Sequence, residues 1–264
     1  SRGQILIWTD TTLHSMTFRG PPYIFGFREL ATGCGLGSPN GVVEIGGNVF
    51  WIGVNQFFVF DGAVKPILST VSNHVFDDFN LNQIEKVVAG LNKQHNEVFW
   101  FYPSAGSAEN DRYAKYNYRE NAWDVGTMVR TAWQDASTFT NNVGASSDGY
   151  LYQHEVGVDD DGSAMTSYIQ SADIDIGDGE EVMFVDRIIP DATITGTLDS
   201  YVKTRKHPAD SYTTKGAFAM SATTKRVNPR ARGRQIAVRF ESTRVGDNWR
   251  LGATRVDMNP DGGR

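Results

Sequence analysis

Short apolar and aromatic runs alternate with polar turns along the first 155 residues of the chain. One unit recurs: an apolar run of strand character, a polar turn, and a second run rich in aromatic residues. The four copies comprise residues 5–8 with 13–18, 49–52 with 57–62, 98–101 with 113–118, and, most weakly, 144–147 with 148–152. Their starts are 44, 49 and 46 residues apart. A period of about 40 to 50 residues built from strands is typical of β-propeller blades.

Aromatic residues within these copies are the predicted core of the propeller-like region. They are Trp8, Trp51, Phe58, Trp100, Tyr116 and Tyr150. Asp61-Gly62 and Asp148-Gly149 fit tight hairpin turns, because glycine tolerates a positive φ. A single helix is predicted, over residues 71–89, where apolar residues lie near helical spacing.

The composition changes at residues 157–163, which are rich in glycine and aspartate. We therefore expect propeller-like blades over residues 1–156, a linker over 157–163 and a C-terminal β domain over 164–264. Apolar residues beyond the linker alternate with period two, as in Ile236, Val238 and Phe240. The predicted fold class is all-β, with propeller-like repeats followed by a C-terminal β-sandwich-like sheet.

No motif in the chain indicates catalysis, a cofactor or a metal site. The five histidines lack the spacing of a metal-binding helix. Asp159, Asp161 and Ser163 are spaced like the start of a calcium loop, but Gln170 stands where the loop requires glutamate. Cys34, in a glycine-rich loop, has no visible activating neighbour. We expect a protein that is not an enzyme and that has no catalytic residues, no cofactor and no metal ligands.

Several sequence segments, taken in their order along the chain, resemble segments of one protein family. Residues 51–62 read Trp-Ile-Gly-Val-Asn-Gln-Phe-Phe-Val-Phe-Asp-Gly. This segment is similar to the W-G-x-x-x-F-x-x-Y-D-G phrase of tail nozzle, or tail tubular, proteins of short-tailed bacteriophages, including the packaged-DNA stabilisation group. The segment is followed by Val64, Pro66 and Ile67, and similar features continue in residues 71–79, 96–103, 113–118, 121–123, 232–240 and 249–252, so the resemblance covers most of the chain.

The resemblance implies a structural protein of the virion tail that is assembled in the host cytoplasm. Such proteins form a ring, commonly six-fold, around the channel through which DNA leaves, and they help to retain and eject the genome. The implied partners are further copies of the chain, the adjacent head–tail adaptor, tail fibre or plug proteins, and genomic DNA that passes without sequence specificity. Alternatives are another tail ring such as an adaptor or hub, a carbohydrate-binding β-propeller module, and a propeller glycosidase with two convergent carboxylates.

Charge is distributed unevenly along the chain. Residues 201–264 contain 14 Lys and Arg against 5 Asp and Glu, whereas residues 1–200 contain 11 against 26. The basic candidates for a subunit interface are Arg226, Arg230, Arg232 and Arg234, whose guanidinium groups suit carboxylates of an acidic neighbour. Nucleic-acid phosphate is the alternative ligand. We prefer docking on an acidic neighbour, because a channel that must release DNA gains little from cationic side chains that bind the DNA tightly. No apolar run reaches the roughly 20 residues of a membrane-spanning segment.

Overall fold

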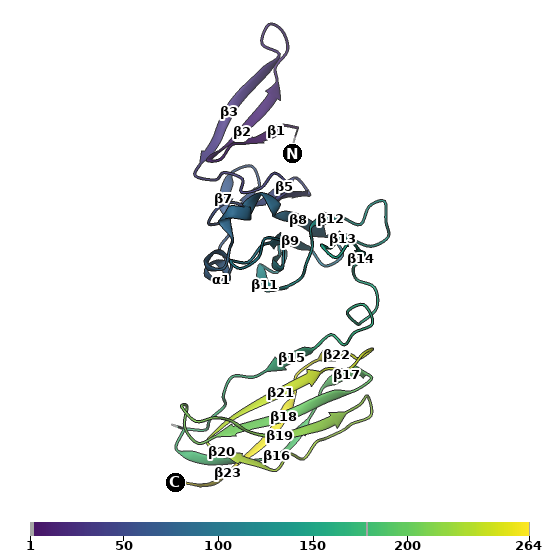
Figure 1. Ribbon diagram of the computed structural model, residues 1–264. Helices are drawn as coiled ribbons and strands as arrows, with labels where there is room; N and C mark the ends of the chain where they lie inside the picture. Colours follow the sequence, from purple (N-terminus) through teal and green to yellow (C-terminus); the bar gives the residue numbers. More distant parts are fainter. Residues whose placement is uncertain (1–2, 178, 264) are drawn as a thin grey trace. The chain divides into compact units, whose positions relative to one another are not determined.

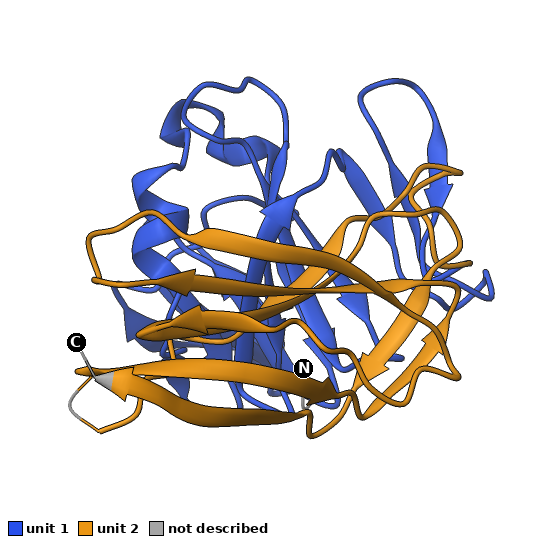
Figure 2. Cartoon of the chain, turned by 90° about the horizontal axis from the view of Figure 1, so that it is seen from below, with its two compact units in different colours: residues 1–156 blue, residues 157–264 orange. Residues whose placement is uncertain are grey.

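The computed structural model describes residues 3–177 and 179–263, and the chain divides into two compact units, residues 1–156 and 157–264 (Figure 2). Strands account for 50% of the residues and helices for 5%. The predicted all-β class is therefore confirmed. The change between units coincides with the start of the glycine- and aspartate-rich segment 157–163.

Four antiparallel sheets make up the described part of the N-terminal unit, and in each of them strands adjacent in sequence are paired (Figure 1). The first sheet contains β1 (Ile5–Trp8), β2 (Thr12–Phe18) and β3 (Phe25–Thr32). The second contains β4 (Val42–Ile45), β5 (Asn48–Ile52), β6 (Phe57–Phe60) and β7 (Val64–Pro66). The third contains β8 (Val88–Asn92), β9 (Glu97–Tyr102), β10 (Arg112–Asn117) and β11 (Ala122–Thr127), and the fourth β12 (Ala132–Gln134), β13 (Val143–Ala145) and β14 (Leu151–Gln153).

Each copy of the repeated sequence unit supplies two neighbouring strands of one sheet. The pairs are β1 with β2, β5 with β6, β9 with β10, and β13 with β14. The repeat thus has a direct counterpart in the local structure. Within the part of the chain that the structure describes, no closed barrel or propeller is found. The propeller-like arrangement of the sheets therefore stays a prediction.

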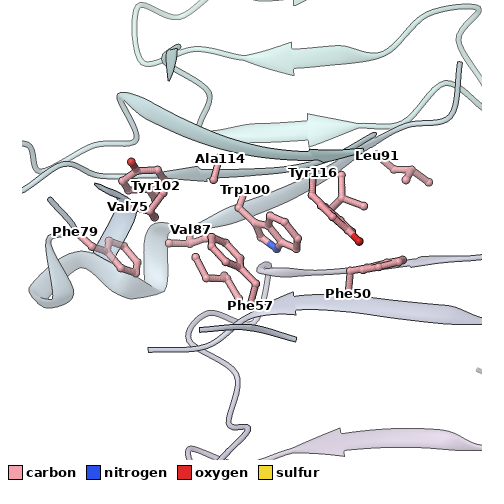
Figure 3. Packing of buried hydrophobic residues seen from close by; sticks show 12 residues of the cluster. Phe50, Phe57, Val75, Phe79, Val87, Leu91, Trp100, Tyr102, Ala114 and Tyr116 are labelled. Atoms are coloured by element: carbon pink, nitrogen blue, oxygen red, sulfur yellow. The ribbon is translucent and has the colours of Figure 1, made fainter. Parts of the chain in front are cut away.

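Aromatic side chains join each sheet of this unit to the next. Trp51, in the core between the first and second sheets, stacks on Phe58 at a ring-centroid distance of 5.4 Å and meets Trp8 edge-on at 5.5 Å. Phe57 of the second sheet contacts Trp100 of the third at 4.9 Å, within the cluster drawn in Figure 3.

The fourth sheet is attached through Trp133. Its ring stacks on Phe99 of the third sheet at 5.7 Å and contacts Phe101 at 5.3 Å. The same ring lies over Gly90 of β8, where a side-chain carbon would come within 2.6 Å of it. Glycine at this position is therefore what lets the two sheets approach closely.

The predicted aromatic core is largely confirmed. Trp51, Phe58, Trp100 and Tyr116 are buried, and Trp8 is partly buried against Trp51. The prediction for Tyr150 is wrong, because its side chain is 68% exposed. Its backbone belongs to the turn before β14, where its amide donates to the Asp148 carboxylate at 3.0 Å.

The helix predicted over residues 71–89 is shorter and broken. The structure has α1 (Ser72–Asp77), then the 3-10 helix η1 (Leu81–Lys86), and residue 88 already begins β8. Between the two helices, Phe79 forms a β-bridge with Ser104 and the Asn80 amide donates to the Pro103 carbonyl at 3.0 Å. Pairing with the segment that directly follows β9 therefore replaces the hydrogen bonds that would have continued the helix.

The described part of the C-terminal unit consists of three antiparallel sheets. One has the order β15 (Ser167–Gln170), β21 (Gln235–Ser242), β18 (Leu198–Arg205), β19 (Thr213–Met220); the others are β20 (Ala231–Gly233), β16 (Glu181–Ile189), β23 (Arg255–Gly263), and the pair β17 (Ala192–Thr195), β22 (Asn248–Leu251). Their common core includes Met183 and Val185 of β16, Val202 of β18, and Ile236 and Phe240 of β21. The alternation noticed in residues 236–240 thus marks a buried strand face.

Candidate functional site

A basic groove of about 850 Å³ lies at one end of the sheets in the C-terminal unit. The end of β18, the start of β19, β20 and the last residues of β23 form its walls. Six Lys and Arg side chains and two carboxylates line it: Arg205, Lys206, Lys215, Arg230, Arg232 and Arg234, with Asp210 and Asp261. We refer to this feature as the basic groove.

Three of the four arginines predicted as interface residues meet in this groove. Arg230, Arg232 and Arg234 line it, whereas Arg226 is exposed and is not among its lining residues. Gly233 explains the arrangement, because a side-chain carbon there would come within 2.7 Å of Thr204. The glycine lets β20 lie close to the end of β18, and the Arg234 amide donates to the Arg205 carbonyl at 3.2 Å.

The other cations of the groove come from residues 205–215, a segment that no sequence motif marks. Arg205 ends β18, Lys206 follows it, and Lys215 lies in β19. The Lys215 ammonium donates to the Arg230 carbonyl at 2.5 Å, which ties β19 to the basic segment. The signal that could have found them is the surplus of Lys and Arg throughout residues 201–264.

Some cations of the groove are neutralised within the chain and others are not. Arg232 pairs with Asp261 at 2.7 Å, and Arg205 pairs with Asp173. The Tyr212 hydroxyl also donates to Asp173, and this hydrogen bond raises the pKa of Tyr212. By contrast, the structure as described places no carboxylate within 4.0 Å of Lys206, Arg230 or Arg234. The groove therefore has free cationic groups suited to carboxylates or phosphates.

The outer face of the first sheet is a second candidate interaction surface. The β1–β2–β3 register places Ile5, Met16 and Phe27 in one cross-strand row, beside the pair Phe18 and Phe25. Phe18 is 71% and Phe27 is 67% exposed, and the Phe18 and Phe25 rings meet edge-on at 6.0 Å. We refer to these five residues as the apolar face. Large exposed apolar patches mark protein interaction sites.

Cys34 and Asp159, the other residues that the sequence offers for chemistry, make contacts that maintain the local structure. Cys34 is buried, which raises the pKa of its thiol, and its carbonyl accepts the Trp51 indole N–H at 3.0 Å. Asp159 caps a turn by accepting the Gly162 amide at 3.0 Å. Among residues 3–177 and 179–263, no three His, Cys, Asp or Glu side chains gather as a metal site would require. The helices described are all too short and too polar to cross a membrane.

Comparison of the chain with protein-family models and with curated proteins gives no match.

Proposed function

We propose that the chain is a structural subunit of a short bacteriophage tail, where copies of it form the nozzle ring around the DNA exit channel. Its role is mechanical: rigid β units fix the channel and help to retain and eject the genome, without turnover. The proposal joins the resemblance of residues 51–62 and of the later phrases to a framework of small, tightly packed aromatic sheets.

The apolar face is the observation that supports this proposal most strongly. The second and third sheets are packed against a neighbour on both sides, whereas the first sheet packs only against the second within the described part of the N-terminal unit. Its other side exposes Phe18, Phe27 and Ile5 to solvent. Apolar surface of this kind is covered by another protein in an assembly, and a ring of identical copies provides such a neighbour.

The finer architecture is part of the proposal. Sheets of three or four antiparallel strands follow one another along the chain and are joined face to face by aromatic residues, as blades of a propeller are. In the C-terminal unit, β16 and β21 contribute to one core from different sheets, which supports a sandwich-like packing. The neighbours in the virion would be the head–tail adaptor, fibre or plug proteins, and DNA that passes without sequence-specific contacts.

The mass of the purified full chain tests the proposal. We expect a closed ring, seen as one high-mass species by light scattering and as annular particles by electron microscopy. Phe18→Ser with Phe27→Ser should reduce the assembly to smaller species. The matched control, Leu68→Ser, removes an apolar side chain that is 87% exposed but lies outside the apolar face, and it should leave the mass unchanged. A strict monomer at all concentrations would refute the ring.

Imaging of virions decides where the ring belongs. Antibodies against the chain should label the free end of the tail if the chain is a nozzle. Labelling next to the portal would instead assign it to an adaptor, and labelling along the tail axis to a hub.

A further inference from the structure

In the C-terminal unit, acidic and basic residues are concentrated in different parts of the sequence, although their total numbers are nearly equal. Residues 157–200 contain 11 acidic residues and one basic residue, whereas residues 201–264 contain 5 acidic and 14 basic residues. The basic groove concentrates the positive half at one end of the sheets. Charge separation of this kind favours association in which unlike regions of two copies meet.

The strongest acidic run of this unit is the loop Asp159, Asp160 and Asp161, which we refer to as the acidic loop. A pair of backbone hydrogen bonds between Asp160 and Ser163, both 2.9 Å, closes the loop. Asp160 and Asp161 are exposed, and within the described residues none of the three carboxylates has a Lys, Arg or His partner within 4.0 Å. The loop therefore presents three carboxylates without a countercharge.

The acidic loop and the basic groove lie at opposite ends of the same sheet. The chain passes from the loop into β15, where Ser167 pairs with Ser242 at the end of β21. The groove lies at the start of β21, where Gln235 pairs with Arg205. Eight residues of β21 separate these ends, or about 25 Å at the rise of a β-strand. Figure 1 shows the chain entering the unit at the end far from β20. The acidic loop of one copy therefore lies too far from the basic groove of the same copy to bind in it.

We propose that the basic groove binds the acidic loop of a second copy of the chain, head to tail. Three carboxylates of the loop match three cations without a carboxylate partner, Lys206, Arg230 and Arg234. The Asp261 carboxylate on the groove wall already pairs with Arg232 at 2.7 Å, so the guanidinium groups of the groove are placed where they can bind carboxylates. Because groove and loop are different surfaces, the contact is heterologous and can propagate from copy to copy until a ring closes. This inference rests on the proposed homo-oligomer and names two of its contacting surfaces.

Charge reversal on each side of the contact is the test, performed on the full chain by light scattering. Arg230→Glu with Arg234→Glu reverses the groove, and Asp160→Lys with Asp161→Lys reverses the loop. Each variant alone should weaken self-association by roughly tenfold or more, because like charges then face each other. An equal mixture of the two variants should recover the assembly, since each reversed groove then meets a reversed loop and each native groove a native loop.

Two controls make the outcomes distinguishable. Lys225→Glu with Lys93→Glu makes the same charge change at exposed residues outside the groove, and its assembly should match that of the native chain; circular dichroism checks that all variants fold. If the native chain assembles and the groove variant assembles equally well, or the mixture fails to recover, this inference is overturned while the ring remains. A monomeric native chain would overturn both. If groove reversal abolishes binding to a random-sequence DNA duplex at low salt and leaves self-association intact, the groove serves nucleic acid and the inference is wrong.

Discussion

At the scale of single residues, buried indole groups do more than fill the core. Trp51 donates its indole N–H to the Cys34 carbonyl at 3.0 Å, and Trp100 donates to the Gly41 carbonyl at 3.2 Å. Both acceptors belong to the glycine-rich segment 33–41, which has little secondary structure of its own. A buried carbonyl needs a partner, so these two donors fix the segment to the second and third sheets.

Trp51→Phe should therefore destabilise the N-terminal unit more than its loss of volume suggests. The change leaves the Cys34 carbonyl without its donor and opens a small cavity beside Phe58, and we expect a loss of about 2 to 4 kcal/mol in the free energy of unfolding. Urea unfolding measures it as a shift of the midpoint at constant slope. Leu151→Ala, at a side chain that is 74% exposed, should change the free energy by less than about 0.5 kcal/mol. Equal effects of the two substitutions would contradict this role of the indole.

His154 should make the stability of the fourth sheet depend on pH. Burial, and then the neighbouring Arg130, lower the pKa of His154 to about 4, and Arg130 Nε donates to His154 Nε2 at 2.8 Å, which requires the neutral imidazole. The imidazole of the unfolded chain has a pKa near 6.5. Between about pH 4 and pH 6.5 the unfolded state therefore binds a proton that the folded state does not bind. The contribution of this group is constant above about pH 6.5 and becomes increasingly destabilising as the pH falls to about 4.

The pH effect is measured as a difference between two proteins. The melting temperature of the native chain should fall between pH 6.5 and 4 by more than that of His154→Gln, whose amide does not titrate. The cost is of the order of 1 to 2 kcal/mol after allowance for partial solvent screening. Parallel pH profiles of the two proteins would show that His154 does not carry the effect.

At the scale of elements, local alternation and turn chemistry were enough to predict the strand pairs, but contacts distant in sequence decided the rest. The two runs of each repeat pair, because a polar connection, from three residues between β1 and β2 to nine between β9 and β10, brings them together. The helix over residues 71–89 was lost to pairing of Phe79 with Ser104, which its own spacing cannot reveal. The basic groove was likewise half predicted: Arg230, Arg232 and Arg234 form an obvious basic run, whereas Lys215 joins them only through strand pairing.

The junction between the third and fourth sheets depends on the absence of a side chain at Gly90. Gly90→Ala would place a carbon 2.6 Å from the Trp133 ring, and the ring must move away from Phe99 and Phe101. We expect hydrogen exchange to become faster in β12, β13 and β14 while β5 and β9 stay protected, because only this junction opens. Gly106→Ala, where a side-chain carbon meets nothing within 4 Å, is the matched control and should leave exchange unchanged. Uniformly faster exchange across the unit would contradict a local opening.

At the scale of the whole molecule, the three core clusters respect the division into two units. The two clusters of the N-terminal unit contain residues between Leu6 and Val125, and the third contains residues between Ile176 and Met258. Burial of apolar surface is the main source of stability, so each unit contains what it needs to fold alone.

Separately produced chains of residues 1–156 and 157–264 should each unfold cooperatively on heating, as followed by circular dichroism. A break at residue 106 is the control, because it separates β9 from β10, which pair over six residues and share the core around Trp100. Chains of residues 1–106 and 107–264 should therefore lose the cooperative transition of the N-terminal unit and keep that of the C-terminal one. If residues 157–264 alone show no cooperative transition, the C-terminal unit requires the N-terminal one, and the charge-reversal variants of its groove and loop would then act on a surface that only the intact chain maintains.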